Sequence, residues 1–149
     1  HHQLSAQWQL QHGTPARALA EAEQGVRMAD AVPFPLQRLS CLLLALCARL
    51  VMGVPPGTLA GPLAEAMRAA RRIGSQGYLM NALFLEAVLA HRQGAARRAG
   101  QALDEAQAIV RACGAQRIRK IPPALLAESG CTAADARHFA GWTASAATT

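Results

Sequence analysis

The chain has 149 residues and a mass of 15.7 kDa, which is the usual size of one domain and is enough to bury about two thirds of the unfolded surface. Apolar residues make up 52% and charged residues 16%, which excludes an intrinsically disordered chain, while 34 alanines and 4% aromatic residues argue against a β-sandwich or β-barrel. The net charge of +6 does not by itself assign a nucleic-acid partner, because such a footprint needs basic residues gathered on one face.

Proline and glycine positions divide the chain into helices. They predict helices over residues 4–11, 15–29, 36–52, 58–73, 78–92, 95–112 and 122–128. Thr14 is placed to cap the second helix, with Pro15 at its first position, and Thr58 is placed to cap the fourth. Thr132 and Asp135 have the spacing of a capping box, which predicts one more short helix near the end.

A short motif recurs in the second helix of each predicted pair. Residues 19–22, 63–66 and 103–106 read L-[A/D]-E-A, with separations of 44 and 40 residues. Gly13 and Gly94 stand in the turns before the first and third copies. A period of this length is that of a helix hairpin. We therefore expect three hairpins followed by short capping helices and a tail, with bounds of about 1–31, 34–74, 76–114 and 115–149.

The segments that carry the motif resemble a known repeat. G-T-P-A-R-A-L-A-E-A at 13–22 and G-A-A-R-R-A-G-Q-A-L-D-E-A at 94–106 resemble the second half of a tetratricopeptide repeat, where a turn glycine precedes small residues that let two helices lie close together. The resemblance covers about residues 3–114. The spacing is longer than the usual 34 residues, and the tryptophan-leucine-glycine pattern of the first helices is absent.

Longer helices of this kind are similar to the tetratricopeptide-like sensor regions of large bacterial signalling ATPases and ATP-dependent transcriptional regulators. The resemblance implies an all-α fold, a right-handed superhelix of antiparallel helix hairpins (an α-α solenoid) with about six to eight helices. In such a superhelix the first helix of each hairpin lines a concave groove. The groove-facing positions that it implies are Gln7, Gln11, Ser40, Cys47, Asn81, Phe84, Val88 and His91.

Each of these eight positions has a second interpretation, which is packing in the core or plain exposure to solvent. Asn81 is suited to hold a peptide backbone, because its amide both donates and accepts hydrogen bonds. Small residues in the second helices are expected to permit close helix approach: Ala18, Ala22, Ala99, Ala102 and Ala106. Leu43, Leu63 and Leu103 are expected in the core, where truncation costs about 2 to 5 kcal/mol.

No pattern in the sequence indicates catalysis or metal binding. The five histidines are dispersed without H-x-x-x-H or H-E-x-x-H spacing, and neither a G-x-S-x-G elbow nor a phosphate-binding loop occurs. Cys41 and Cys47 lie six apart in an apolar helix, where we expect small, inert core residues and no disulfides. We therefore expect a non-catalytic protein with no metal and no other cofactor.

The densest basic cluster consists of Arg111, Arg117, Arg119 and Lys120. Aromatic residues for base stacking are not interleaved with it. The cluster is interpreted first as a solvated face, then as a contact with an acidic partner or another domain, and last as a non-specific phosphate contact.

These observations predict a protein-interaction or effector-sensing module, whose partner is a protein, a peptide or a neighbouring domain. The chain opens without a methionine or an apolar leader, and its longest apolar run, 39–54, is shorter than the roughly 20 residues of a membrane span. We therefore expect a cytoplasmic piece of a larger protein, and the resemblance implies that this protein is a bacterial regulator of signalling or transcription. Two alternatives stay open: a homo-oligomerisation element, which could form a homodimer because an uncapped solenoid end is apolar, and a basic domain that contacts nucleic acid.

Overall fold

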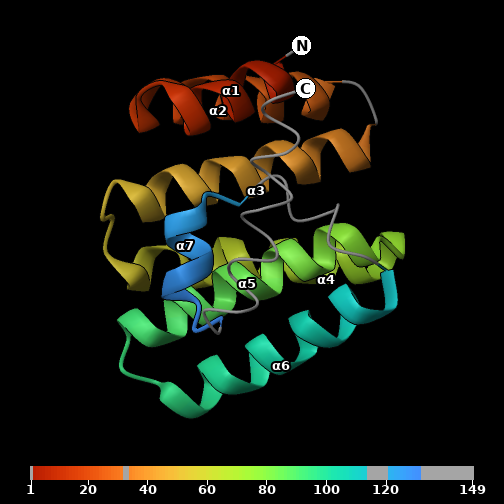
Figure 1. Ribbon diagram of the computed structural model, residues 1–149. Coiled ribbons are helices and arrows are strands. Elements are labelled where there is room, and N and C mark those ends of the chain that lie inside the picture. Colours follow the sequence, from red (N-terminus) through yellow and green to blue (C-terminus); the bar gives the residue numbers. More distant parts are fainter. Residues whose placement is uncertain (1, 32–33, 114–120, 132–149) are drawn as a thin grey trace, which may run out of the picture.

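The computed structural model (Figure 1) describes residues 2–31, 34–113 and 121–131, which form seven α-helices and one short 3-10 helix without a β-strand. Their bounds are α1 His2–His12, α2 Pro15–Ala31, α3 Pro35–Val51, η1 Pro56–Thr58, α4 Ala60–Ile73, α5 Gln76–Arg92, α6 Ala96–Cys113 and α7 Pro123–Glu128. The predicted all-α class and the predicted number of helices are confirmed. The further helix expected near Thr132 and Asp135 lies outside the described residues.

The start of α2 follows the predicted capping chemistry. The backbone N–H of Arg17 donates to the Thr14 hydroxyl over 3.4 Å, and the helix begins at Pro15, whose missing N–H costs nothing at that position. The hairpin turn between α1 and α2 is therefore encoded locally.

The expected cap at Thr58 is wrong. Its hydroxyl donates to the Pro55 carbonyl at 2.8 Å, so it closes the 3-10 turn, and α4 begins two residues later at Ala60. The sequence also placed the start of α5 too late, because Ser75 caps this helix by accepting from the Tyr78 N–H at 3.3 Å. Between the two helices, Gly74 has a φ of 77°, a left-handed conformation that glycine adopts without strain.

The helices are stacked in chain order, and Figure 1 shows α1 and α2 at one end of the stack and α6 at the other. The odd-numbered helices contact one another in succession, α1 with α3 and α3 with α5. Of the even-numbered helices, α2 and α4 each pack against the odd-numbered helices before and after them, and α6 packs against α5. The short helix α7 departs from this order, since it lies across α3 and α5 (Figure 1).

Helix α5 is the centre of the core. Twelve of its 17 residues are buried, because it has α3, α4, α6 and α7 as neighbours. Helix α3 is buried nearly all round as well, with ten buried residues, because apolar residues occur on most sides of it. Of the leucines expected in the core, Leu43 and Leu63 are buried, whereas Leu103 is only half-buried. The predicted cost of truncating Leu103 is therefore too high.

Small residues bring neighbouring helices close together. All five of the alanines singled out from the sequence are buried: Ala18, Ala22, Ala99, Ala102 and Ala106. A separate small cluster joins the first hairpin to α3, and it consists of Ala6, Ala22, Leu44 and Ala45. In the same region Gly25 of α2 lies so close to α3 that a Cβ built there would be 2.4 Å from the Cys41 sulfur. A side chain at Gly25 would therefore displace the Cys41 sulfur or push α2 away from α3.

Ion pairs join different helices of the stack. Glu23 of α2 accepts from Arg49 of α3 at 2.8 Å, and Glu105 of α6 accepts from Arg71 of α4 at 3.0 Å. Both pairs are partly exposed, so each contributes at most about 1 kcal/mol.

Among the residues that the structure describes, no helix is both long enough and apolar enough to cross a membrane.

Candidate partner-binding face

The side of α3 and α5 that α7 crosses is the best-defined candidate site. Three apolar side chains anchor the α7 segment there, and all three, Ile121, Leu125 and Leu126, are buried within the main core cluster. We call this surface the α3–α5 face and define it by Leu50 of α3 and by Asn81, Val88 and Arg92 of α5. On α5, Asn81 and Arg92 are eleven residues apart, which is about three helical turns and places them on the same side of the helix.

Arg92 holds three helices together at this face. Its guanidinium donates two hydrogen bonds to the Glu128 carboxylate of α7, at 2.5 and 2.8 Å. A third N–H donates to the Leu50 carbonyl at 2.6 Å, one of the last carbonyls of α3, which a helix cannot satisfy within itself. The fork geometry of arginine allows all three bonds at once, and lysine could not reproduce it.

The contact with Arg92 changes the protonation of Glu128. Hydrogen bonds from Arg92 lower the pKa of the Glu128 carboxyl, and they outweigh the opposing effect of partial burial. The same contact raises the pKa of Arg92. At neutral pH the pair is therefore ionised, and α7 is held on α5 by a charge-assisted contact.

The chain leaves α7 through a tight turn beside α5. Ser129 is buried, and its hydroxyl donates to the Leu126 carbonyl at 2.5 Å. Gly130 has a φ of 98°, and a Cβ built there would lie 3.2 Å from Nε2 of His91. A larger residue at Gly130 would therefore be strained and would press on the His91 ring.

The attachment of α7 to the face is small. Two of its side chains, Leu125 and Leu126, are buried together with Ile121 just before the helix, and each such burial contributes about 1.5 to 3 kcal/mol. The partly exposed Arg92–Glu128 pair adds at most about 1 kcal/mol. Helices α3 and α5 have ten and twelve buried residues, so α7 is held by far fewer core contacts than they are.

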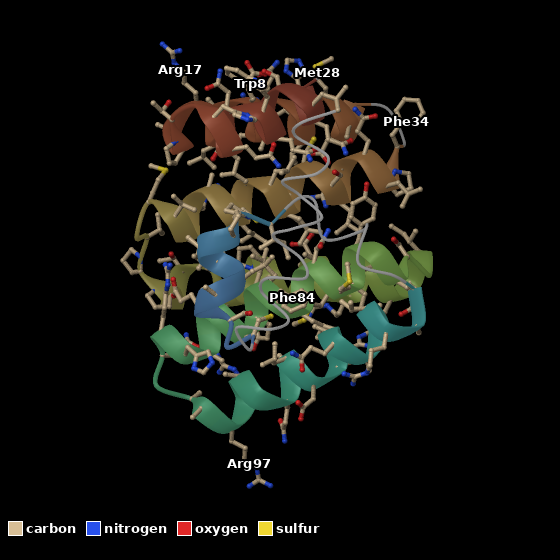
Figure 2. The ribbon with its side chains drawn as sticks, in the orientation of Figure 1. Trp8, Arg17, Met28, Phe34, Phe84 and Arg97 are labelled. Atoms are coloured by element: carbon tan, nitrogen blue, oxygen red, sulfur yellow. The ribbon has the colours of Figure 1, made fainter. Side chains whose placement is uncertain are left out.

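Most of the predicted groove residues are buried (Figure 2). Ser40, Cys47, Asn81, Phe84 and Val88 have at most 3% of their surface exposed, so none of these five is open to solvent in the folded chain, and Figure 2 shows Phe84 inside the stack. A role of these five in partner contact stays a prediction. Gln7 is half-buried, and Gln11 and His91 are exposed; a role for these three in partner contact stays a prediction.

Asn81 differs from the other four buried residues because its side chain is polar and incompletely satisfied. Within the described part of the chain, its Oδ1 is buried and has no hydrogen-bond partner. A buried acceptor left without a donor costs about 1 to 3 kcal/mol, so native structures contain few of them. Asn81 was selected from the sequence for its amide. The structure adds that the amide oxygen accepts no hydrogen bond from the described residues.

The structure describes one of the four residues of the predicted basic cluster. Arg111 is exposed near the end of α6, and Arg117, Arg119 and Lys120 lie outside the described residues. No gathering of these four side chains can be assigned to the fold.

The two cysteines of α3 are buried. Burial raises the pKa of the Cys47 thiol to about 12, which makes this sulfur a poor nucleophile near neutral pH and agrees with the core position predicted for it. Across residues 2–31, 34–113 and 121–131, no three His, Cys, Asp or Glu side chains are grouped as metal ligands.

Sequence reasoning missed Arg92 and Glu128, which are 36 residues apart and follow no local pattern. The one available signal was the predicted short helix at 122–128, whose adjacent leucines give it an apolar side.

Searches with protein-family models, against curated proteins and against solved structures find no match to this chain.

Proposed function

We propose that the chain is a tetratricopeptide-like, non-catalytic interaction module that binds a peptide or a partner domain on the side formed by α1, α3 and α5. The succession of contacts from α1 to α3 to α5 supports it, since an α-α solenoid presents the first helix of each hairpin on one side. The right-handed superhelix is part of this proposal.

The observation that carries the proposal is the Oδ1 atom of Asn81, which is buried and has no hydrogen-bond partner among the residues that the structure describes. It lies on the same side of α5 as Arg92, and therefore on the side where α7 already docks. An N–H group from a bound peptide would supply the missing donor. A chain that retains an unsatisfied acceptor at this position gives up stability, and partner binding offers a physical reason for keeping it.

Peptide selection on the full chain tests this function. Peptides from a random display library are selected on the immobilised protein, and their affinities are measured by fluorescence anisotropy. We expect Asn81→Leu and His91→Ala to weaken binding of selected peptides at least about 5-fold, the loss of roughly one hydrogen bond. Leucine is preferred to alanine at Asn81, because it fills the buried volume and avoids a cavity.

Arg97→Ala is the matched control, because Arg97 is exposed and points away from the stack on α6 (Figure 2). Its affinity for the selected peptides should equal that of the unchanged chain. Peptides whose binding depends on Arg97 and ignores Asn81 and His91 would refute the proposed face.

A second candidate function, self-association, is favoured by the exposed side chains of α1. Leu4 and Trp8 are 70% and 57% exposed, and their spacing of four residues places them on one side of the helix. Figure 2 shows Trp8 at the outer end of the stack. Sedimentation velocity over a concentration range tests this, with Leu4→Gln/Trp8→Gln as the variant expected to remain monomeric. A chain that is monomeric at every concentration would rule out the oligomerisation element.

The third alternative is a contact between the basic cluster and nucleic acid. Arg111 is the residue of this cluster that the structure describes. Binding to phosphates must weaken steeply as salt rises. Titration of duplex DNA at two salt concentrations tests it, and an affinity that is absent or insensitive to salt would exclude this alternative.

A further inference from the structure

Helix α7 shows what kind of segment the α3–α5 face accepts. It presents two adjacent leucines, Leu125 and Leu126, to the core, and its Glu128 carboxylate accepts two hydrogen bonds from Arg92. The opposite side of the helix is exposed at Ala124 and Ala127. The α3–α5 face thus recognises a short amphipathic helix with the pattern L-L-x-E.

We propose that α7 is a releasable occupant of the α3–α5 face, and that the partner which replaces it is an amphipathic helix with two adjacent leucines followed by an acidic residue. This inference rests on the proposed function and adds the chemistry of the partner to it. In the absence of the partner, α7 covers the apolar anchor positions and pairs with Arg92. In its presence, the partner takes over these contacts and α7 leaves the face.

Release of α7 is feasible because its attachment is small. Its helix has six residues, two of which, Leu125 and Leu126, are buried in the core cluster with Ile121 just before the helix, and its ion pair is partly exposed. The packing of α7 on α5 and α3 is much less extensive than that of α6, which packs on α5 along its length (Figure 1).

A longer partner helix would gain a contact that α7 does not make. Asn81 lies about 16 Å from Arg92 along α5, from the rise of an α-helix, and its Oδ1 has no partner within the described residues. A partner that reaches from Arg92 toward Asn81 could supply the missing donor. The partner therefore has a physical means of competing with a helix that is already tethered to the chain.

A peptide supplied in trans tests the exchange. The probe is a fluorescein-labelled peptide of residues 121–130, IPPALLAESG, and the proteins are the full chain and its Leu125→Asp/Leu126→Asp variant. In the variant, the chain's own α7 can no longer compete. The apparent affinity of a site is reduced by the fraction of molecules in which it is open. If α7 is docked in about 90 to 99% of molecules, the variant should bind the probe about 10 to 100 times more tightly.

Matched controls separate this effect from altered folding. The Ala124→Ser/Ala127→Ser chain changes the exposed side of α7 and should bind the probe as weakly as the unchanged chain. A probe carrying Glu128→Ala should bind the Leu125→Asp/Leu126→Asp chain at least about 5-fold more weakly, since it cannot pair with Arg92.

Equal binding of the probe by the unchanged chain and the leucine variant would overturn the inference, and so would no binding by either. In both cases the affinities of the peptides selected from the display library test the proposed function separately. If their binding still depends on Asn81 and His91, the face binds partners and only the role of α7 is wrong.

Hydrogen exchange on the unchanged chain keeps the inference testable if the leucine variant does not fold. The amides of Leu125, Leu126 and Ser129 donate to carbonyls within the α7 segment. We expect them to exchange at least about 10-fold faster than the core amides of α5, because α7 opens locally. Exchange of these amides at the rate of global unfolding would show that α7 does not leave the face, and would overturn the inference.

Discussion

Alanine substitution at two helical glycines should change stability in opposite directions. Gly25 is inside α2 and Gly100 is inside α6. Replacing a helical glycine by alanine normally stabilises a protein by about 0.5 to 1 kcal/mol. At Gly100 a Cβ meets no atom within 4 Å, so we expect the full gain. At Gly25 it would lie 2.4 Å from the sulfur of the buried Cys41, so either the sulfur must rotate within the core or α2 and α3 must move apart.

The magnitude at Gly25 follows from the two opposing terms. Overpacking a well-packed contact costs about 1 to 3 kcal/mol, and the gain in helix propensity offsets about 0.5 to 1 kcal/mol of this cost, so Gly25→Ala should destabilise by up to about 2.5 kcal/mol. The free energies of unfolding come from urea titrations followed by circular dichroism. Because the gain in helix propensity is the same in both variants, the difference between them should equal the overpacking cost, about 1 to 3 kcal/mol.

A double mutant identifies the cause. Cys41→Ala removes the clashing sulfur and leaves the Cys41 Cβ position at 3.3 Å from the new side chain. In this background the cost of Gly25→Ala should fall by about 1 kcal/mol or more, which is the coupling energy expected for residues in contact. If Gly25→Ala and Gly100→Ala shift stability alike, or if the cost at Gly25 is the same with and without the sulfur, the close approach of α2 to α3 is wrong.

The remaining predictions use the same measurements. Phe84→Ala should destabilise by about 3 to 5 kcal/mol, because Phe84 is fully buried, whereas Phe34→Ala, at a side chain 59% exposed, should stay within about 0.5 kcal/mol; equal shifts in Tm would contradict the assignment of Phe84 to the core. Asn81→Leu should raise the free energy of unfolding by about 1 kcal/mol, since it removes an acceptor without a partner; a loss of stability in urea would count against this. Because Arg92 lowers the pKa of Glu128 in the folded state, the ionised carboxylate stabilises the fold at neutral pH, and this contribution is lost as the pH falls through that lowered pKa. Glu128→Gln should therefore flatten the acid part of the plot of urea midpoint against pH, and an unchanged plot would show that the pair contributes nothing.

The helices themselves could be predicted because their ends are encoded locally. Thr14 and Pro15 start α2 through their own side chain and ring, and these signals need no distant partner. At Thr58 the local signal gave the wrong helix start, because the hydroxyl donates to the Pro55 carbonyl and α4 begins two residues later, at Ala60.

The candidate site could be predicted only in part, because a face is defined by what packs on it. The resemblance assigned Phe84 and Val88 to the open side of their helix, but both are buried. Asn81 was selected for its amide, and its unsatisfied oxygen became visible only once its neighbours were in place. The Arg92–Glu128 pair joins residues 36 apart, and no pattern in the sequence connects them.

The sequence by itself determined the all-helical class, the order of the helices and the alanines at which they approach, since propensity, capping and small side chains act over a few residues. The tertiary structure decided that α7 crosses α3 and α5, that Arg92 joins three helices, and that Gly25 lies close against the Cys41 sulfur. These features depend on atoms brought together from distant parts of the chain, where packing and hydrogen-bond geometry within a few ångströms decide the outcome.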